Sequence, residues 1–473
     1  MLVTMFATLK AGAQEFRSAL SLQNSQNPEA PQAQPSPQTK QNPTELKATQ
    51  PAQAQKAMPG SLTLSQALNM ALSNNTIVRG AQSRMEQATG RYAQARGELL
   101  PQLDAKAYQA YMTINLKGIG IDIPTVPQGK SDPFGSMDAR IVLTQDLLNI
   151  ASLRSWKSSR SRQESSRLQV ENARESVVLD VVAAYLQALR AKASRDTVTE
   201  QEKLADDLYK LTQDRVTHGI SASLEANRAM QQVNSLTQQL QEAEQSYVAA
   251  KLTLANQLQV QPITADYEVE DTAAYGAEAP PDKNTAIQTA LAARPDYLSA
   301  TKNVTAAEQQ VQATKATRYP TLSAVFTDGQ SGESPVNNQN TYRIAGVLNF
   351  PIFTSGRIRG QIDEAQGALH EAQSALDQLR FQIQTDVLTA IAGVDWAQKE
   401  VETSGANVKL SREEVQLSRQ RFVQGITDNT EVVNAQDRVS KADDARVRAM
   451  YTLGLARANL ARAMGNAEKT YRK

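Results

Sequence analysis

The chain lacks cysteine, a clear excess of either charge, and any long apolar run. Without cysteine it can form no disulfide, no thiolate metal site and no cysteine nucleophile. Its 50 Lys and Arg nearly balance 49 Asp and Glu, leaving a formal net charge of +1, which argues against nucleic-acid binding through phosphate contacts. The most apolar segment, residues 177–189, is interrupted by Asp180 and Gln187, so no segment is long enough to cross a bilayer as a helix.

Proline and glycine are scarce in two long stretches. Residues 134–261 and 352–473 contain no proline, and Gly219 is the only glycine in 136–275. Because proline and glycine are the strongest helix breakers, each stretch is predicted to form a long helix, a turn and a second helix. The longest of these helices would extend roughly 100 Å at 1.5 Å per residue, which suits a spacer, a filament or a tube.

The two stretches belong to an internal duplication. Residues 100–103 match 319–322 at an offset of 219, and 219–220 match 425–426 at an offset of 206. Both copies are therefore expected to share one fold, and the extra residues of the first copy lie in the segment after Pro101.

Each copy also contains two segments in which apolar and polar residues alternate, which is the period of a half-buried β-strand. Two such hairpins could cap a helical rod. They could also lie in a membrane, but only within a closed barrel, because open sheet edges cannot face lipid. Four strands are too few to close a barrel, since about eight is the practical minimum. Several chains would have to share one barrel, and a trimer would supply twelve strands.

These patterns divide the chain as follows. Residues 1–60 are interpreted as a possible remnant of an export signal and a disordered linker rich in Gln and Pro. The later segments are a first repeat (61–261), a linker or equatorial segment (262–284), a second repeat (285–466) and a C-terminal tail (467–473). The first repeat is predicted to contain strands at about 103–113 and 137–147 and helices at about 63–98, 151–217 and 222–258. The second is predicted to contain strands at about 320–328 and 341–350 and helices at about 285–317, 355–423 and 427–465.

Several motifs, taken in order, resemble those of the TolC family of outer-membrane efflux proteins. The segment LNFPIFTSGR at 348–357 resembles the family's strand exit, and RFVQGI at 421–426 resembles its turn at the periplasmic tip. The copy RVTHGI at 215–220 keeps the arginine and the glycine but not the aromatic residue. Together with residues 62–68 and 293–296, these motifs extend the resemblance over about residues 61–466.

The resemblance implies a mainly α chain with a small β part, built from a duplicated helix–hairpin–long helix–helix unit. It implies a trimer that forms a 12-stranded β-barrel in the outer membrane and a 12-helix α-barrel across the periplasm. Such a channel carries small molecules or proteins from the periplasm to the exterior as the exit duct of a tripartite system. The implied partners are two further chains, outer-membrane lipid, a periplasmic adaptor (membrane fusion) protein and an inner-membrane transporter of the RND or ABC type.

The resemblance also places functional residues at the periplasmic tip. Acids six residues after the turn glycine line the family's lumen, which points here to Glu225 and Glu431, while Asn434 stands where a second acid is common. Six such carboxylates in a trimer would form a cation-attracting pore constriction. The alternative is that each is an ordinary acid in the first turn of a helix, stabilised by the helix dipole.

The tip turns themselves are where the family meets its adaptor. The residues expected to dock it are Arg215, Gly219, Ile220, Arg421, Phe422, Gly425 and Ile426. The plainer explanation of the two glycines is that the chain needs them to reverse direction. Phe422 and Thr427 stand where some members have the tyrosine and arginine of a gate latch, so that latch is not carried over to this chain.

Two other classes of protein fit the sequence less well. A soluble or surface-attached coiled-coil structural or adaptor protein would have little use for two amphipathic hairpins. An enzyme is not supported, because the only two histidines, His218 and His370, fall in different parts of the predicted fold. We expect no catalytic site, no metal site, no cofactor and no nucleic-acid partner.

Overall fold

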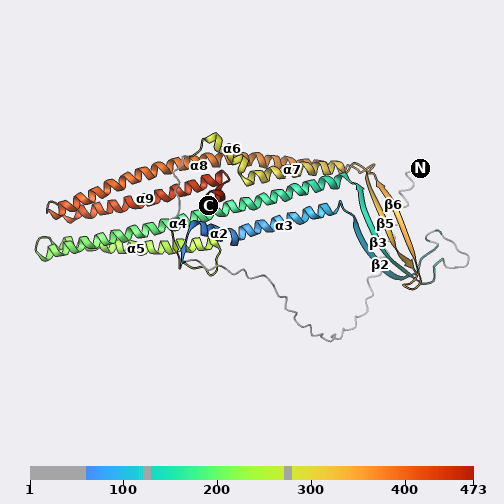
Figure 1. Ribbon diagram of the computed structural model, residues 1–473, viewed down its shortest axis with the longest axis horizontal. Coiled ribbons are helices and arrows are strands. Elements are labelled where there is room, and N and C mark those ends of the chain that lie inside the picture. Colours follow the sequence, from blue (N-terminus) through green and yellow to red (C-terminus); the bar gives the residue numbers. More distant parts are fainter. Residues whose placement is uncertain (1–59, 117, 119, 121–128, 271–279, 473) are drawn as a thin grey trace, which may run out of the picture. The chain divides into compact units, whose positions relative to one another are not determined.

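The computed structural model describes residues 60–116, 118, 120, 129–270 and 280–472. The predicted signal remnant and linker therefore lie outside the described residues, apart from Gly60. The elements form two matching series (Figure 1). The first is β1 (Ser61–Leu62), α2 (Leu64–Asn74), α3 (Thr76–Gly97), β2 (Gln102–Met112), β3 (Phe134–Leu148), α4 (Ile150–Thr217) and α5 (Ser223–Leu258). The second is β4 (Glu268–Val269), α6 (Lys283–Ala293), α7 (Pro295–Ala316), β5 (Thr321–Gly332), β6 (Asn338–Asn349), α8 (Arg357–Val423), α9 (Asn429–Ala463) and α10 (Ala467–Tyr471).

The duplicated, mainly helical fold predicted from the sequence is confirmed. The two long helices, α4 and α8, have 68 and 67 residues. Helix α4 packs against α5, α7 and α9 of its own chain, while α8 packs against α6, α7 and α9. None of the described helices combines the length and the apolarity needed to cross a membrane.

The first helical segment of each copy consists of two helices where the sequence predicted one. Between α2 and α3, Asn75 leaves the helical conformation, and its Oδ1 accepts a hydrogen bond from the Ile77 N–H at 2.8 Å as the N-cap of α3. Between α6 and α7 the break falls at Arg294, directly before Pro295. Proline disfavours helical backbone in the residue before it and is well suited to the first position of a new helix.

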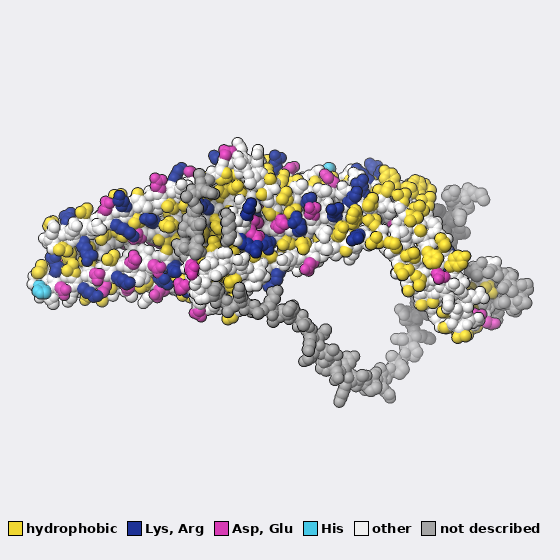
Figure 2. Space-filling model, in the orientation of Figure 1, with side chains coloured by type: hydrophobic (Ala, Val, Ile, Leu, Met, Phe, Trp, Pro, Cys, Tyr) yellow, Lys and Arg dark blue, Asp and Glu magenta, His cyan; other side chains and the backbone are white. Residues whose placement is uncertain are grey.

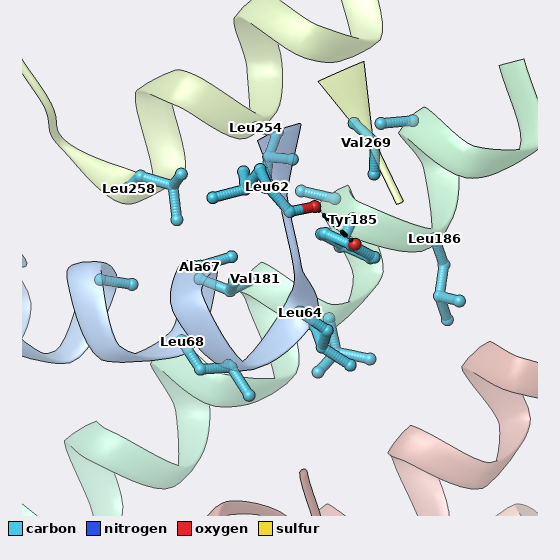
Figure 3. Close-up of a cluster of buried hydrophobic side chains, with 14 of the residues drawn as sticks. Leu62, Leu64, Ala67, Leu68, Val181, Tyr185, Leu186, Leu254, Leu258 and Val269 are labelled. Carbon is cyan, nitrogen blue, oxygen red and sulfur yellow. Dashed lines mark hydrogen bonds between the residues drawn. The ribbon is translucent and has the colours of Figure 1, made fainter. Parts of the chain in front are cut away.

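The largest buried cluster lies where β1, α2, the middle of α4, the end of α5 and β4 meet. Figure 3 shows Leu62, Leu68, Val181 and Leu254 converging around Tyr185. The Tyr185 hydroxyl lies 2.9 Å from the carbonyl oxygen of Leu62 and 2.5 Å from that of Glu270. One buried tyrosine therefore links β1 to the residue that directly follows β4, at the end of a small parallel sheet that the sequence did not predict.

The four longer strands form one antiparallel sheet in the order β2-β3-β5-β6, so β3 and β5 join the two copies. Leu103, Leu143, Phe326 and Ile344 pair in register and therefore lie in one row on the same face. The opposite face carries charged residues, including Lys106 paired with Arg140. Figure 2 shows apolar side chains gathered over the sheet and charged ones over the helices. The sheet thus has one apolar and one polar face, and its two edges are β2 and β6.

The second hairpin is longer than the sequence predicted. Residues 329–332, which fall between the two predicted strands of the second copy, continue strand β5. A Cβ on Gly329 would lie 2.3 Å from the backbone oxygen of Ala139. Glycine is therefore explained here by the close approach of β3, because any side chain would collide with that strand.

The C-terminal residues form the short helix α10 instead of a free tail. Ala467 is buried, and its N–H donates to Glu175 Oε2 of α4 at 2.8 Å. Glu468 forms an ion pair with Arg174, also on α4. The hydrogen bonds with Arg174 lower the pKa of the Glu468 carboxyl, whereas burial raises the pKa of the Glu175 carboxyl.

Candidate functional site

The helical hairpins α4–α5 and α8–α9 end in turns of the same geometry. Gly219 has a φ of +69° and Gly425 a φ of +72°. In each turn the N–H of the following isoleucine donates to the carbonyl of the arginine four residues before the glycine, at 2.8 Å and 2.9 Å. Both turns are Schellman caps, which place a residue in the left-handed region where glycine alone is free of strain. The chain reversal is therefore enough to explain both glycines.

Apolar side chains project into solvent just beyond these glycines. Ile220 is 66% exposed and Ile426 is 62% exposed. A Cβ added to either glycine would meet no atom within 4 Å, so the surface beside each turn is open. Neither isoleucine is needed to fill a core within this chain, and both are accessible to a partner.

Two of the expected docking residues lie between the hairpins. Phe422 is 1% exposed and packs with Leu208 of α4 and Val432 of α9. The Arg215 guanidinium carbon lies 4.7 Å from the centre of the Phe422 ring, and its Nη1 donates to the Phe422 carbonyl oxygen at 3.0 Å. In the single chain these two residues therefore join the two hairpins, and the Phe422 side chain is not at the surface.

Further contacts between the hairpins come from residues that sequence reasoning did not single out. Asn429, which is 1% exposed, donates from Nδ2 to the Glu225 carbonyl oxygen at 3.1 Å. Arg228 Nη1 donates to Thr430 Oγ1 at 3.1 Å. The only signal in the sequence was a polar residue, Asn429, in the first turn of the predicted helix 427–465, and this is too common to identify a contact.

The two predicted constriction acids have different surroundings. Glu431 lies 3.4 Å from the Arg421 Nη1, and its Oε2 accepts a hydrogen bond from Thr427 Oγ1 at 2.5 Å. The Glu225 carboxylate has neither an ion pair nor a hydrogen bond within the part of the chain that the structure describes. Both acids lie in the first turn of their helices. The helix dipole therefore stabilises each carboxylate whether or not it faces a pore.

Asn434 is exposed on α9, three residues beyond Glu431. No cluster of three or more Asp, Glu, His or Cys side chains suited to a metal ion occurs among the described residues. A ring of acids at the tips would therefore have to be assembled from more than one chain.

The architecture described above is that of an outer-membrane channel protein: paired long helices that end in glycine turns, and a sheet with one apolar face. The family model of the outer membrane efflux proteins matches residues 67–258 and 286–466. The chain belongs to this family. Its resemblance to the TolC family is confirmed.

Individual relatives agree with this assignment. The chain is 28% identical over 417 residues to the pyoverdine export outer membrane protein OpmQ of Pseudomonas putida, which covers 85% of this chain and 85% of the relative. Its fold is similar to the VceC outer membrane protein of Vibrio cholerae, with a TM-score of 0.74, 17% identity and coverage of 85% of this chain and 96% of that chain. The CmeC outer membrane channel of Campylobacter jejuni gives a TM-score of 0.72, 18% identity and coverage of 85% and 86%.

The protein is thus an outer-membrane efflux channel of tripartite export systems, with its helical part in the periplasm. Its family is one of channels and not of enzymes. The expectations for function and location are confirmed at this level.

Proposed function

We propose that the chain works as a homotrimer in which three four-stranded sheets close one barrel and the helices of three chains continue it through the periplasm. The observation that carries this proposal is the pair of sheet edges, β2 with 11 residues and β6 with 12, which have no partner strand among the described residues. Their backbone N–H and C=O groups must be satisfied in lipid, where there is no water. Joining β6 of one chain to β2 of the next satisfies them.

A row of apolar side chains along α8 supports the same assembly. The row consists of Phe381, Leu388, Trp396, Leu410 and Leu417, and all of them are exposed in the single chain. Their spacings of 7, 8, 14 and 7 residues are close to two or four helical turns, so they lie along one side of the helix. Exposed apolar rows of this kind mark interaction surfaces. We assign this one to the neighbouring chain.

The tips would then face the other members of the export system. The exposed Ile220 and Ile426, together with the open backbone beside Gly219 and Gly425, offer a surface for the hairpin tips of a periplasmic adaptor. The adaptor would in turn connect the channel to an inner-membrane transporter of the RND or ABC type. Phe422 and Arg215 would support this surface from between the hairpins and would not contact the adaptor directly.

Three pairs of tips would also form the pore constriction, with Glu225 and Glu431 lining it and Asn434 one helical turn farther along α9. The contacts of Arg215, Arg228 and Asn429 between the hairpins would hold the tips together when the channel is closed. Opening then requires those contacts to break, which links docking of a partner to widening of the pore.

Cross-linking between β2 and β6 tests the shared barrel directly. The chain has no cysteine, so two introduced thiols are unique. Ala107→Cys on β2 would be combined in turn with Asn340→Cys, Tyr342→Cys or Ile344→Cys on β6, which covers different staggers of the strands. Neighbouring strands lie about 4.8 Å apart, so β2 and β6 of one chain are roughly 14 Å apart. A bismaleimide that spans about half of that distance can therefore join only strands of different chains.

A shared barrel predicts covalent trimers from at least one of these pairs in membranes. The single-cysteine variants serve as controls and should remain uncoupled. If all three pairs give only uncoupled chains while both thiols remain reactive toward a maleimide dye, the shared barrel is wrong.

A further inference from the structure

The duplication surrounds each tip acid with the same set of side chains. Each set contains an arginine at the end of the long helix, a hydroxyl residue in the turn and a hydroxyl residue farther back in the long helix. These are Arg215, Ser221 and Thr212 for Glu225, and Arg421, Thr427 and Ser418 for Glu431, all related by an offset of 206. From the sequence alone, the two carboxylates are therefore expected to be equivalent.

In the second copy all three side chains converge on the acid. Arg421 lies 3.4 Å from Glu431 Oε1, and the hydroxyls of Thr427 and Ser418 lie 2.5 Å and 3.5 Å from its carboxylate oxygens. The Arg421 side chain is 53% exposed and that of Glu431 is 33% exposed, so the pair lies at the surface. Its charge is nevertheless balanced within the hairpin.

In the first copy the equivalent side chains are used elsewhere. Arg215 donates to the Phe422 carbonyl oxygen and, through Nε, to Ser221 Oγ at 3.3 Å. The Thr212 hydroxyl donates to the backbone oxygen of Leu208 at 2.8 Å. None of them contacts the Glu225 carboxylate, which pairs with no cation among the described residues.

The difference follows from one residue. Phe422 provides an aromatic ring for Arg215 to lie against, and such cation–π contacts stabilise a cation over the face of a ring. The residue equivalent to Phe422 in the first copy is Val216, which offers Arg421 no ring. Arg421 is therefore free to pair with its own acid.

We propose that the two acids of the constriction are inequivalent: Glu225 is the carboxylate that binds cations in the closed channel, and Arg421 is a built-in counter-ion that neutralises Glu431. The inference rests on the proposed position of both acids at the pore constriction. The ligand class is hydrated divalent cations, held by one carboxylate from each chain. Arg228, one turn farther along α5, donates from Nη1 to Thr430. Arg438, two turns beyond Glu431 on α9, pairs with Glu414 and also interacts with Glu431 through its charge.

Because Arg421 pairs with Glu431 and lies at the docking tip, it could couple binding of a partner to the charge of the pore. Its guanidinium is accessible at the same tip that carries Ile426. A partner that binds this guanidinium would withdraw the positive charge from Glu431. Three more carboxylates would then become available in the pore when the tips are engaged.

Block of single channels by magnesium chloride, added on the periplasmic side in planar bilayers, tests the inference. Glu225→Gln should weaken the block roughly fivefold or more, because it removes the carboxylate that has no paired cation. Glu431→Gln leaves the charge of Arg421 without its partner and should also weaken the block. Arg421→Gln should tighten the block roughly fivefold by exposing Glu431. The double variant Arg421→Gln with Glu431→Gln should return to the wild-type affinity.

Two controls separate charge from structure. Arg421→Lys keeps the charge and should leave the block unchanged. Arg419→Gln removes the same charge from an exposed position on the same helix, which forms no ion pair with the described residues, and should also leave the block unchanged.

The outcomes distinguish this inference from the proposal on which it rests. An unchanged block in Arg421→Gln would overturn the counter-ion and leave the constriction in place, as would a double variant in which the block is as weak as in Glu431→Gln alone. If neither glutamine variant alters the block, the constriction itself is wrong. If Arg421→Gln does not assemble, the double variant decides the matter: a block weaker than that of the wild type would overturn the counter-ion.

Discussion

Arg215 lies over the ring of Phe422, with the guanidinium carbon 4.7 Å from the ring centre, and donates to the carbonyl oxygen of the same residue. The two residues are 207 positions apart and belong to different copies of the duplicated unit. Their contact joins hairpin α4–α5 to hairpin α8–α9 at the tips, where we propose that the pore constriction lies.

Replacing Arg215 should loosen the tips. A hydrogen bond from a charged donor contributes about 1.5–3 kcal/mol and a partly exposed cation–π contact about 0.5–1 kcal/mol, and Arg215→Gln removes both. We expect a larger single-channel conductance and a greater open fraction than in the wild type. Lys210→Gln, a basic residue farther back on α4 that pairs with Asp206 of the same helix, is the matched control. Conductance equal to the wild type in Arg215→Gln would show that this contact does not restrain the tips.

Replacing the exposed isoleucines should uncouple the channel from its adaptor. Ile220→Asp combined with Ile426→Asp adds charge to the surface proposed to dock the partner and disturbs no buried contact, because both side chains lie in solvent. Export in cells should fall at least tenfold. The purified variant should keep the conductance and the thermal stability of the wild type.

The variant Leu224→Asp is the control for added charge, because Leu224 is another exposed apolar residue close to the Gly219 turn. Full export by the double isoleucine variant would remove these residues from the docking surface.

Introducing charge into the apolar row of α8 should disrupt assembly. Leu410→Glu with Leu417→Glu would bury two carboxylates between chains, and an unpaired buried charge costs several kcal/mol. We expect monomers in detergent at concentrations where the wild type is assembled. The control is Leu204→Glu on α4, a helix that is flanked on both sides by α5 and α9 of its own chain. Assembly unaffected by the double variant would exclude this row from the interface.

Acid should weaken the attachment of α10 to α4. The pKa of Glu468 is lowered from its ordinary value of 4.5 by its hydrogen bonds with Arg174. A carboxyl whose pKa is lower in the folded state contributes stability that is present above pH 4.5 and is lost as the pH falls below that value. Glu175, whose pKa is raised by burial, acts in the opposite sense and contributes less as the pH rises.

Glu468→Gln should therefore destabilise the protein at pH 7 and have little effect near pH 3. Thermal unfolding of the wild type and the variant at both values measures this. An equal loss at both pH values would show that the ion pair is not the cause.

The sequence predicted the duplicated fold because its signals were local and repeated. The absence of proline and glycine indicated the long helices, and alternation indicated the strands. The break at Asn75 was also within reach, because asparagine is among the preferred N-caps. Gly329 was placed in a loop because glycine weakens strands, and the sequence does not reveal that a neighbouring strand passes 2.3 Å from where its Cβ would lie.

The tip was harder to predict because its chemistry depends on contacts between the copies. The motif around Phe422 was recognisable, but its burial depends on Leu208 and Val432, which come from two other helices. The inequivalence of Glu225 and Glu431 depends on which partner each arginine takes, and this is decided by a ring 207 residues from Arg215. Local patterns carry no information of that kind.

The mass of the protein extracted from membranes in detergent tests most directly whether three chains share one channel. Light scattering that separates protein from detergent should give about three times the 51.5 kDa of the chain, or of its processed form as weighed under denaturing conditions. The protein should also precipitate once detergent is removed. A monomer or dimer that stays in solution without detergent would contradict the account and favour a coiled-coil rod.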